Sequence, residues 1–307
     1  MFQYILKRIM EIIPLILVVS ILTFLFIHLI PGDPARLVAG KDATLDDVTR
    51  VSIEMGLDQP IWKQYITFMG NLVQGDLGTS LKTGLPISAM FADRFMPSIY
   101  LTLISLGWAL VLGLIIGALS AVFKNKWPDY VGMVTAVSGI SLPGFWLGLI
   151  LIQIFSVQLG WFPTGGAEGW KSYVLPSITL GAGIMSMLAR FTRSSLLETL
   201  KADYIRTGRA KGLRESSVLI KHALRNSLIP VVTIAGLQFG FLLGGSVVVE
   251  TVFSFPGMGR LLIDSIAFRD YPVIQSAILL FSIEFILVNL LVDILYSLLN
   301  PKIQYES

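Results

Sequence analysis

Polar side chains that are costly in lipid stand inside several long apolar runs of the sequence. An ionisable or amide group at membrane depth usually faces protein or a water-filled cavity, because contact with lipid is unfavourable. We therefore expect part of a translocation path among these residues. The candidates are Gln153, Gln238, Glu250, Glu284 and Asn289. For Glu250 an alternative is open, in which the carboxylate bonds the backbone of the turn that follows it, residues 254–259.

The sequence shows no arrangement of residues for enzymatic chemistry. The chain has no cysteine and two histidines, His28 and His222, which leaves no thiolate site and little for a histidine cluster. The H-E-x-x-H pattern of a metalloprotease is absent, as is the G-x-x-x-x-G-K-[ST] loop that cradles the phosphates of ATP. We expect no catalytic residue, metal site or cofactor on this chain, so that any ATP must be hydrolysed by another polypeptide.

The composition is that of an integral membrane protein. Hydrophobic residues make up 54% of the 307 residues, and the mean hydropathy is +0.75. Several apolar runs approach or exceed the ~20 residues that a helix needs to cross a bilayer. We predict an all-α membrane protein with six transmembrane helices, the fourth being the shortest. The predicted spans are 12–30, 98–123, 130–157, 175–190, 229–253 and 273–299.

Charge distribution gives the predicted spans an orientation. A polar segment, 31–97, separates the first two spans, and a cationic segment, 201–227, separates the fourth from the fifth. Lys and Arg gather in short cytoplasmic loops of membrane proteins. By this rule both termini and segment 201–227 are cytoplasmic, whereas segment 31–97 is extracytoplasmic. The same charges could serve topology alone. Nucleic-acid binding is disfavoured, because neither stacking aromatics nor a base-reading module accompanies them.

The cationic segment has the pattern of a helix, a turn and a second helix, with Gly212 as the break. Small residues before the break, at 207–210, would let another surface approach the backbone closely. The residues after the break recur at helical spacing and predict one apolar helix face. That face consists of Leu213, Ser217, Ile220 and Leu224. The pattern therefore indicates a docking element.

A glycine repeat in the fifth span predicts close helix packing. Gly236, Gly240 and Gly244 recur every four residues and share one helix face. Small residues at this spacing let helices approach closely in membranes. The seam could meet a partner subunit or pack within this chain.

Motifs along the whole chain resemble one family of transport proteins. The stretches RTGRAKG at Arg206 and HALRNSLIPVV at His222 resemble the EAA-type cytoplasmic loop of binding-protein-dependent ABC importer permeases. Together with further motifs, they are similar to the dipeptide, oligopeptide, glutathione and nickel permease family, above all to its glutathione and dipeptide members. These motifs are PGDP at Pro31, GLDQP at Gly56, GDLG at Gly75, ISLPGFWLG at Ile140, LPSITLG at Leu175, GGSVVVETVFSFPGMGR at Gly244 and RDYPVIQ at Arg269.

The resemblance implies a type I ABC importer permease fold, with one permease domain over residues 1–307 in a bacterial inner membrane. The implied partners are a second homologous permease, two cytoplasmic ATPases that bind ATP and Mg, and an extracytoplasmic solute-binding protein. The chain would be a transporter subunit, not an enzyme, and would form half of the path for a dipeptide, oligopeptide or glutathione. A nickel or metal-chelate importer is the alternative. A self-contained secondary transporter fits less well, because the sequence shows neither inverted repeats nor paired broken helices.

The resemblance also assigns a role in ATPase coupling to the cationic segment. In the family, a short helix of this loop sits in a groove of the ATPase and transmits its closure to the membrane helices. The matching residues are Asp203, Tyr204, Arg206, Thr207, Gly208, Arg209, Ala210, Lys211, Gly212 and Leu213. The family's Glu-Ala-Ala positions are occupied here by Arg206, Thr207 and Gly208. Glycine costs a helix about 1 kcal/mol relative to alanine, so we expect this helix to be firm only against its partner.

Overall fold

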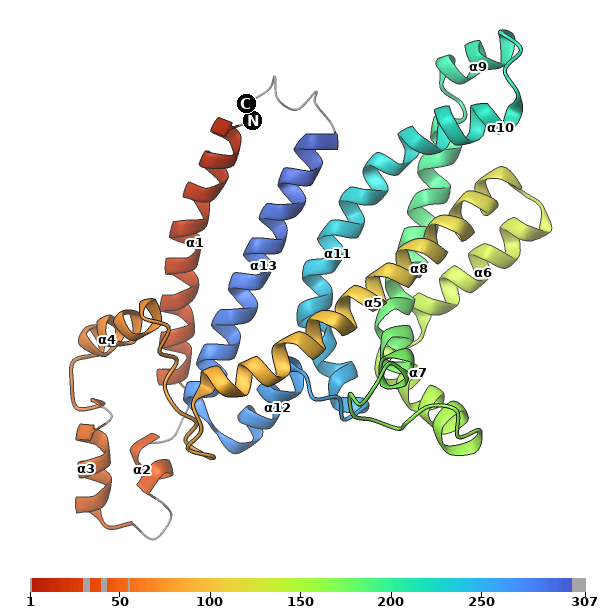
Figure 1. Cartoon of the computed structure of the whole chain (residues 1–307). Helices are drawn as coiled ribbons and strands as arrows, with labels where there is room; N and C mark the ends of the chain where they lie inside the picture. Colours follow the sequence, from red (N-terminus) through yellow and green to blue (C-terminus); the bar gives the residue numbers. More distant parts are fainter. Residues whose placement is uncertain (1, 30–33, 40–42, 55, 300–307) are drawn as a thin grey trace.

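The computed structural model describes residues 2–29, 34–39, 43–54 and 56–299, and these form helices joined by turns (Figure 1). The predicted all-α class is confirmed, since the β-structure of the described residues is limited to one isolated bridge, Thr79 with Pro86. The helices are α1 (Phe2–Leu29), α2 (Pro34–Ala39), α3 (Leu45–Glu54), α4 (Ile61–Val73), α5 (Ile87–Val122), α6 (Trp127–Ser141), α7 (Gly144–Leu151), η1 (Ile152–Gln158), α8 (Lys171–Thr199), α9 (Asp203–Ala210), α10 (Glu215–Ser217), η2 (Val218–Leu224), α11 (Arg225–Val252), α12 (Met258–Phe268) and α13 (Tyr271–Leu299).

Three helices of the described chain are long and apolar enough to cross a membrane: α5, α8 and the Tyr271–Val292 part of α13. The number of candidate spans rises to five if each of two pairs of helices that meet at a bend is counted as one span. By length and composition the predicted six spans are therefore not confirmed. The prediction that the fourth span is the shortest is wrong, because α8 continues for 29 residues to Thr199.

The third predicted span is broken, not continuous. Helices α6 and α7 meet at an angle of 103°. Leu142 and Pro143 at the junction have extended backbone, with ψ of 127° and 131°. Proline lacks an N–H and disfavours a helical conformation of the residue before it, so α6 has to end here. The third span, predicted as the continuous stretch 130–157, is therefore interrupted near its middle.

Helix α8 is the centre of the bundle. Its apolar stretch is 61% buried, against 28% for that of α5. Glycines bring α5 onto it: a methyl group added at Gly113 would lie 2.8 Å from Leu188 Cβ, and one at Gly117 would lie 2.5 Å from the Ala189 carbonyl oxygen. Small residues allow such close approach of helices in membranes. The sequence analysis did not single out this glycine pair of α5.

The glycine seam of α11 packs within this chain at two of its three residues. A methyl group added at Gly236 would lie 2.7 Å from the Val292 side chain, and one at Gly240 would lie 3.0 Å from Phe285, both on α13. A methyl group at Gly244 would meet no atom within 4 Å. The predicted close packing is thus confirmed for the first two glycines.

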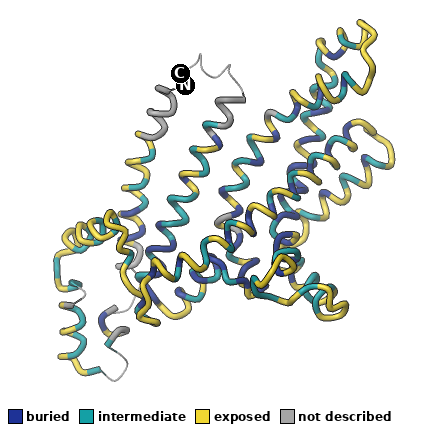
Figure 2. Tube along the Cα trace, in the orientation of Figure 1, coloured by how far each residue is buried: buried dark blue, intermediate teal, exposed yellow. Residues whose placement is uncertain are grey.

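The two ends of the bundle carry different segments. The start of α1, the end of α13 and the α9–α10 segment lie at the upper end in Figure 1, and α2, α3, α4 and α12 lie at the lower end. The α4 helix is attached to α1, because Tyr65 shares a 2.7 Å hydrogen bond with Ser20 and stacks edge-on against Phe24. Figure 2 shows that burial is concentrated along α8 and its neighbours, whereas α3 and α4 are largely exposed.

The contact between α5 and α8 can be tested with a methyl group. We expect Gly117→Ala to lower the free energy of unfolding by about 1–3 kcal/mol, the usual range for overpacking, because the backbone of α8 blocks the new atom. Gly107→Ala, in the same helix, is the control, since a methyl group there meets no atom within 4 Å. Thermal unfolding of the purified chain in detergent measures both. Equal midpoints for the two variants would contradict the close contact.

Candidate functional site

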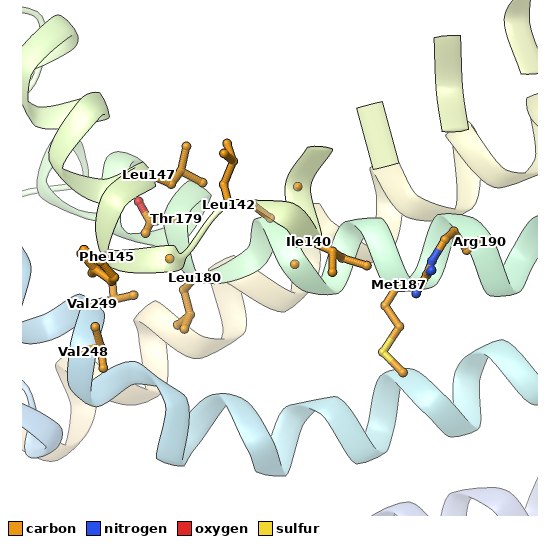
Figure 3. Close-up of a pocket in the computed structure, with 14 residues that line it drawn as sticks. Ile140, Leu142, Phe145, Leu147, Thr179, Leu180, Met187, Arg190, Val248 and Val249 are labelled. Carbon is orange, nitrogen blue, oxygen red and sulfur yellow. The ribbon is translucent and has the colours of Figure 1, made fainter. Parts of the chain in front are cut away.

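A hollow of about 690 Å³ lies beside the break between α6 and α7 (Figure 3). Four helices contribute to its wall: α6, α7, α8 and α11. The residues that line it are Gly139, Ile140, Leu142, Gly144, Phe145, Leu147, Thr179, Leu180, Ala182, Gly183, Met187, Arg190, Val248 and Val249. Most of the wall is therefore aliphatic or glycine.

One charged side chain lies in the wall of this hollow. Arg190 is the ionisable member of the 14 lining residues, it is exposed, and it lies beside Met187 in Figure 3. The hydroxyl of Thr179 is engaged in its own helix, where it donates to the Leu175 carbonyl oxygen at 2.9 Å. The sequence analysis did not select Arg190, because it stood at the end of the fourth predicted span, 175–190.

The polar residues predicted for a path are not brought together at the hollow; none of them belongs to its described lining. Gln153 is exposed on η1, and Gln238 is half-buried on α11. Glu284 and Asn289 are half-buried on α13. Their part in a path stays a prediction.

Glu250, the fifth of these residues, is fully buried in a network of hydrogen bonds. Ser98 Oγ donates to its Oε1 at 2.7 Å, and the Arg260 backbone N–H donates to its Oε2 at 3.0 Å. Ser98 Oγ also accepts from the Met258 N–H at 2.8 Å. The first turn of α12 thus gains partners for two N–H groups that its own helix cannot satisfy, and the helix dipole favours the carboxylate there. This geometry favours the structural alternative for Glu250.

A second buried carboxylate, Asp129, ties the start of α6 to α8. Arg193 donates to it with two hydrogen bonds, from Nε at 2.7 Å and from Nη2 at 2.8 Å. The Asn125 N–H donates to the same carboxylate at 2.9 Å. Such a fork fixes geometry as well as charge. Arg190, about one turn earlier on α8, has no such acidic partner among the described residues.

The residues assigned to ATPase coupling lie on the projecting α9 helix and the turn after it (Figure 1). All ten are exposed except Gly208, which is half-buried. Gly212 closes the turn with φ of +76°, a conformation open to glycine and strained for other residues. Its N–H donates to the Arg209 carbonyl oxygen at 2.9 Å. The Arg209 guanidinium also donates to the Glu215 carboxylate at 2.6 and 3.1 Å, which joins α9 to α10 across the turn.

One residue that the sequence analysis missed anchors α9 to the bundle. Ile205 is 1% exposed, although it stands among polar residues. It packs in a cluster from the ends of α5, α8 and η2. The other buried members of this cluster are Ala121, Leu196, Val218 and Ala223.

The predicted apolar face after Gly212 is not the face that packs on the bundle, although Leu224 is half-buried beside it. Leu213 and Ile220 are 43% and 65% exposed, whereas Val218 and Ala223 are buried. The reason is the winding of residues Val218–Leu224 as a π-helix. Its hydrogen bonds run from i to i+5, so each residue turns through a smaller angle and another set of side chains faces the bundle.

Two family descriptions match consecutive parts of the chain. "Binding-prot-dependent transport system membrane comp, N-term" matches residues 1–101, and "Binding-protein-dependent transport system inner membrane component" matches residues 109–305. The chain is 56% identical over 306 residues to the glutathione transport system permease protein GsiC of Pectobacterium atrosepticum, with 100% of both chains covered. The GsiC protein of Escherichia coli is 54% identical over the same length, again with 100% of both covered.

Solved structures share the fold at low sequence identity. An inward-facing structure of the MetNI methionine ABC transporter superposes with a TM-score of 0.60 at 20% identity, covering 69% of this chain and 97% of the other. An amino acid ABC transporter with histidines gives a TM-score of 0.57 at 15% identity, covering 68% of this chain and 94% of the other. Among the described residues, no group of three His, Asp or Glu could hold a metal ion.

The structural role of Glu250 can be separated from a role in transport. We expect Glu250→Ala to lower the thermal stability of the purified chain, because an unsatisfied buried donor costs roughly 1–3 kcal/mol. The variant leaves both the Ser98 hydroxyl and the Arg260 N–H without their acceptor. Glu168→Ala removes an exposed carboxylate and is the control. Unchanged stability together with reduced transport would assign Glu250 to the path instead.

Proposed function

The chain belongs to the family of inner membrane components of binding-protein-dependent transport systems, and from this premise we propose that it forms half of the path of an ATP-driven importer for small peptides. Its relatives are permease subunits, so the chain is a transporter subunit and not an enzyme. The observation that carries the choice of substrate is the 54–56% identity over the full length to permeases named for glutathione transport. Glutathione is therefore the first cargo to test, ahead of other small peptides.

The proposed topology has six spans in a bacterial inner membrane: α1, α5, α6 with α7–η1, α8, η2 with α11, and α13. Both termini and segment 201–227 are cytoplasmic in this proposal, and segment 31–97 is extracytoplasmic. Support comes from the bundle itself, where the start of α1, the end of α13 and the α9–α10 segment share one end (Figure 1). The excess of Lys and Arg near that end agrees with the cytoplasmic side.

The proposed coupling element is the α9 helix with its turn, Asp203 to Leu213. Its polar face is exposed and free to enter an ATPase groove, whereas Ile205 holds its other face on the ends of α5 and α8. The ion pair between Arg209 and Glu215 links α9 to α10 across the turn. A push on α9 would therefore reach η2 and α11. The partners in this proposal are two ATPases that bind ATP and Mg, a second permease and an extracytoplasmic solute-binding protein.

Uptake into proteoliposomes tests the substrate. The assembled complex, with its binding protein outside and ATP inside, is offered labelled glutathione, a labelled dipeptide and nickel, the cargo of the alternative importer. We expect saturable, ATP-dependent uptake of glutathione. Uptake of nickel alone would replace the peptide proposal with the metal one. Uptake of glutathione without ATP would contradict the ABC mechanism.

The coupling role is tested at Gly212. We expect Gly212→Val to reduce ATP-dependent uptake at least tenfold while the complex still assembles, because a β-branched residue at φ of +76° is a steric outlier and reshapes the turn. Gly208→Ala is the matched control, since its methyl group would meet Leu213 Cδ1 at an ordinary 3.5 Å. Uptake and ATPase activity are measured on the same preparations. Normal uptake by Gly212→Val would rule out the coupling assignment.

A further inference from the structure

The hollow beside the α6–α7 break has a wall that lipid would not tolerate. Leu142 has extended backbone and α7 restarts at Gly144, and both residues line the hollow. The last carbonyl groups of α6 lack the N–H partners that a continuous helix would supply. Non-helical backbone at membrane depth is tolerated only where protein covers it or where it lines a water-filled cavity. The hollow therefore faces protein or an aqueous path rather than lipid.

The depth of the break supports this assignment. Helix α6 has 15 residues, so at 1.5 Å per residue the break lies about 22 Å from its first residue. A hydrocarbon core is about 30 Å thick, so the break lies inside it if the third span enters the membrane near Trp127, as in the proposed topology. The hollow, at about 690 Å³, also has the size of small-molecule sites, which commonly measure ~300–1,000 Å³.

The charge of the hollow selects the kind of ligand. Arg190 is the ionisable residue of the described lining, and no described carboxylate pairs with it. Arg193, three residues further on, is neutralised by Asp129 and so has a structural partner already. An unpaired guanidinium in a largely apolar hollow attracts an anion, and its planar fork matches a carboxylate with two hydrogen bonds.

We propose that this hollow is a binding subsite for a carboxylate of the transported peptide, with Arg190 as its counter-ion. The inference rests on the proposed function, because it takes a peptide as the cargo. The apolar wall contributed by Ile140, Leu142, Phe145 and Val248 covers the uncharged part of the ligand. Arg190 thereby adds to the path a residue that binds the charge common to all small peptides, glutathione included.

The absence of cysteine from the chain allows a direct test of the hollow's charge. Met187→Cys places a thiol beside Arg190. In the assembled complex this thiol is treated with an anionic or a cationic methanethiosulfonate reagent, and the rate of each reaction is measured by mass spectrometry of this chain. We expect the anionic reagent to react faster. The ratio of the two rates should fall roughly tenfold when Arg190→Gln is added, as expected for a unit charge at close range and intermediate dielectric constant.

S-methylglutathione, whose blocked sulfur cannot consume the reagent, should protect the thiol of Met187→Cys from either reagent, and Arg190→Gln should abolish that protection. Leu112→Cys, on the exposed apolar face of α5, is the control for lipid-facing positions and should stay unreactive. A thiol at 187 that reacts with neither reagent would overturn the proposal, because the hollow would then be closed to water. A rate ratio unaffected by Arg190→Gln would overturn it as well.

Transport by the same variants completes the test. With saturating binding protein, we expect Arg190→Gln to reduce glutathione uptake roughly tenfold, the usual worth of a charge-assisted hydrogen bond, and Arg190→Lys to restore part of it. Lys171→Gln removes a charge from the start of the same helix, outside the hollow, and should leave uptake unchanged. Equal loss in the Gln and Lys variants would make Arg190 a structural residue. Wild-type complex that imports no glutathione would contradict the proposed function, whereas the rate ratio at position 187 tests the charge of the hollow independently.

Discussion

The close contact of α8 with its neighbours is the constraint on which the rest of the structure depends. In lipid no hydrophobic effect draws helices together, so packing and hydrogen bonds must do so. Gly113 and Gly117 bring the backbone of α5 onto α8, and Gly139 brings α6 against Ser186 and Ala182. The Asp129–Arg193 fork fixes α6 in register at one end. With α8 held in this way, the broken α6–α7 segment and α11 enclose a hollow along its remaining side.

Buried carboxylates hold the ends of this bundle in a similar manner. Glu250 joins α11 to α5 and to the first turn of α12 through Ser98 and Arg260. Asp270 accepts from Ser80 Oγ and from the Leu81 N–H, so it fixes the segment before α5 to the junction of α12 and α13. Both carboxylates bond neutral donors from distant parts of the chain. Partners such as these satisfy a buried charge that would otherwise be costly.

The sequence predicted what depends on composition and on local chain chemistry. Apolar run length predicted an all-helical membrane protein, and the motif resemblance predicted the family. Gly212 was recognised as the break of the cationic segment, where the structure has a positive φ. The failures involve features that periodicity cannot report. Pro143 lies within the stretch predicted as one span, 130–157, and a count of apolar residues does not register the helix break that a proline causes. The π-helix at Val218–Leu224 changed which residues are buried without any change in composition. Arg190 was missed because it is distinguished by having no described carboxylate close enough to pair with it, and only the fold shows this.

The turn at Gly212 has a consequence for how this gene can vary. A glycine codon reaches alanine, serine, valine, arginine, cysteine, tryptophan, aspartate and glutamate by single nucleotide changes. None of these adopts φ of +76° as readily as glycine, and aspartate is the mildest of them. Asparagine, which tolerates this conformation best among the remaining residues, needs more than one nucleotide change from any glycine codon. Every amino-acid change that a single nucleotide substitution can make at this codon therefore strains the turn between α9 and α10. A route to asparagine has to pass through one of these strained variants.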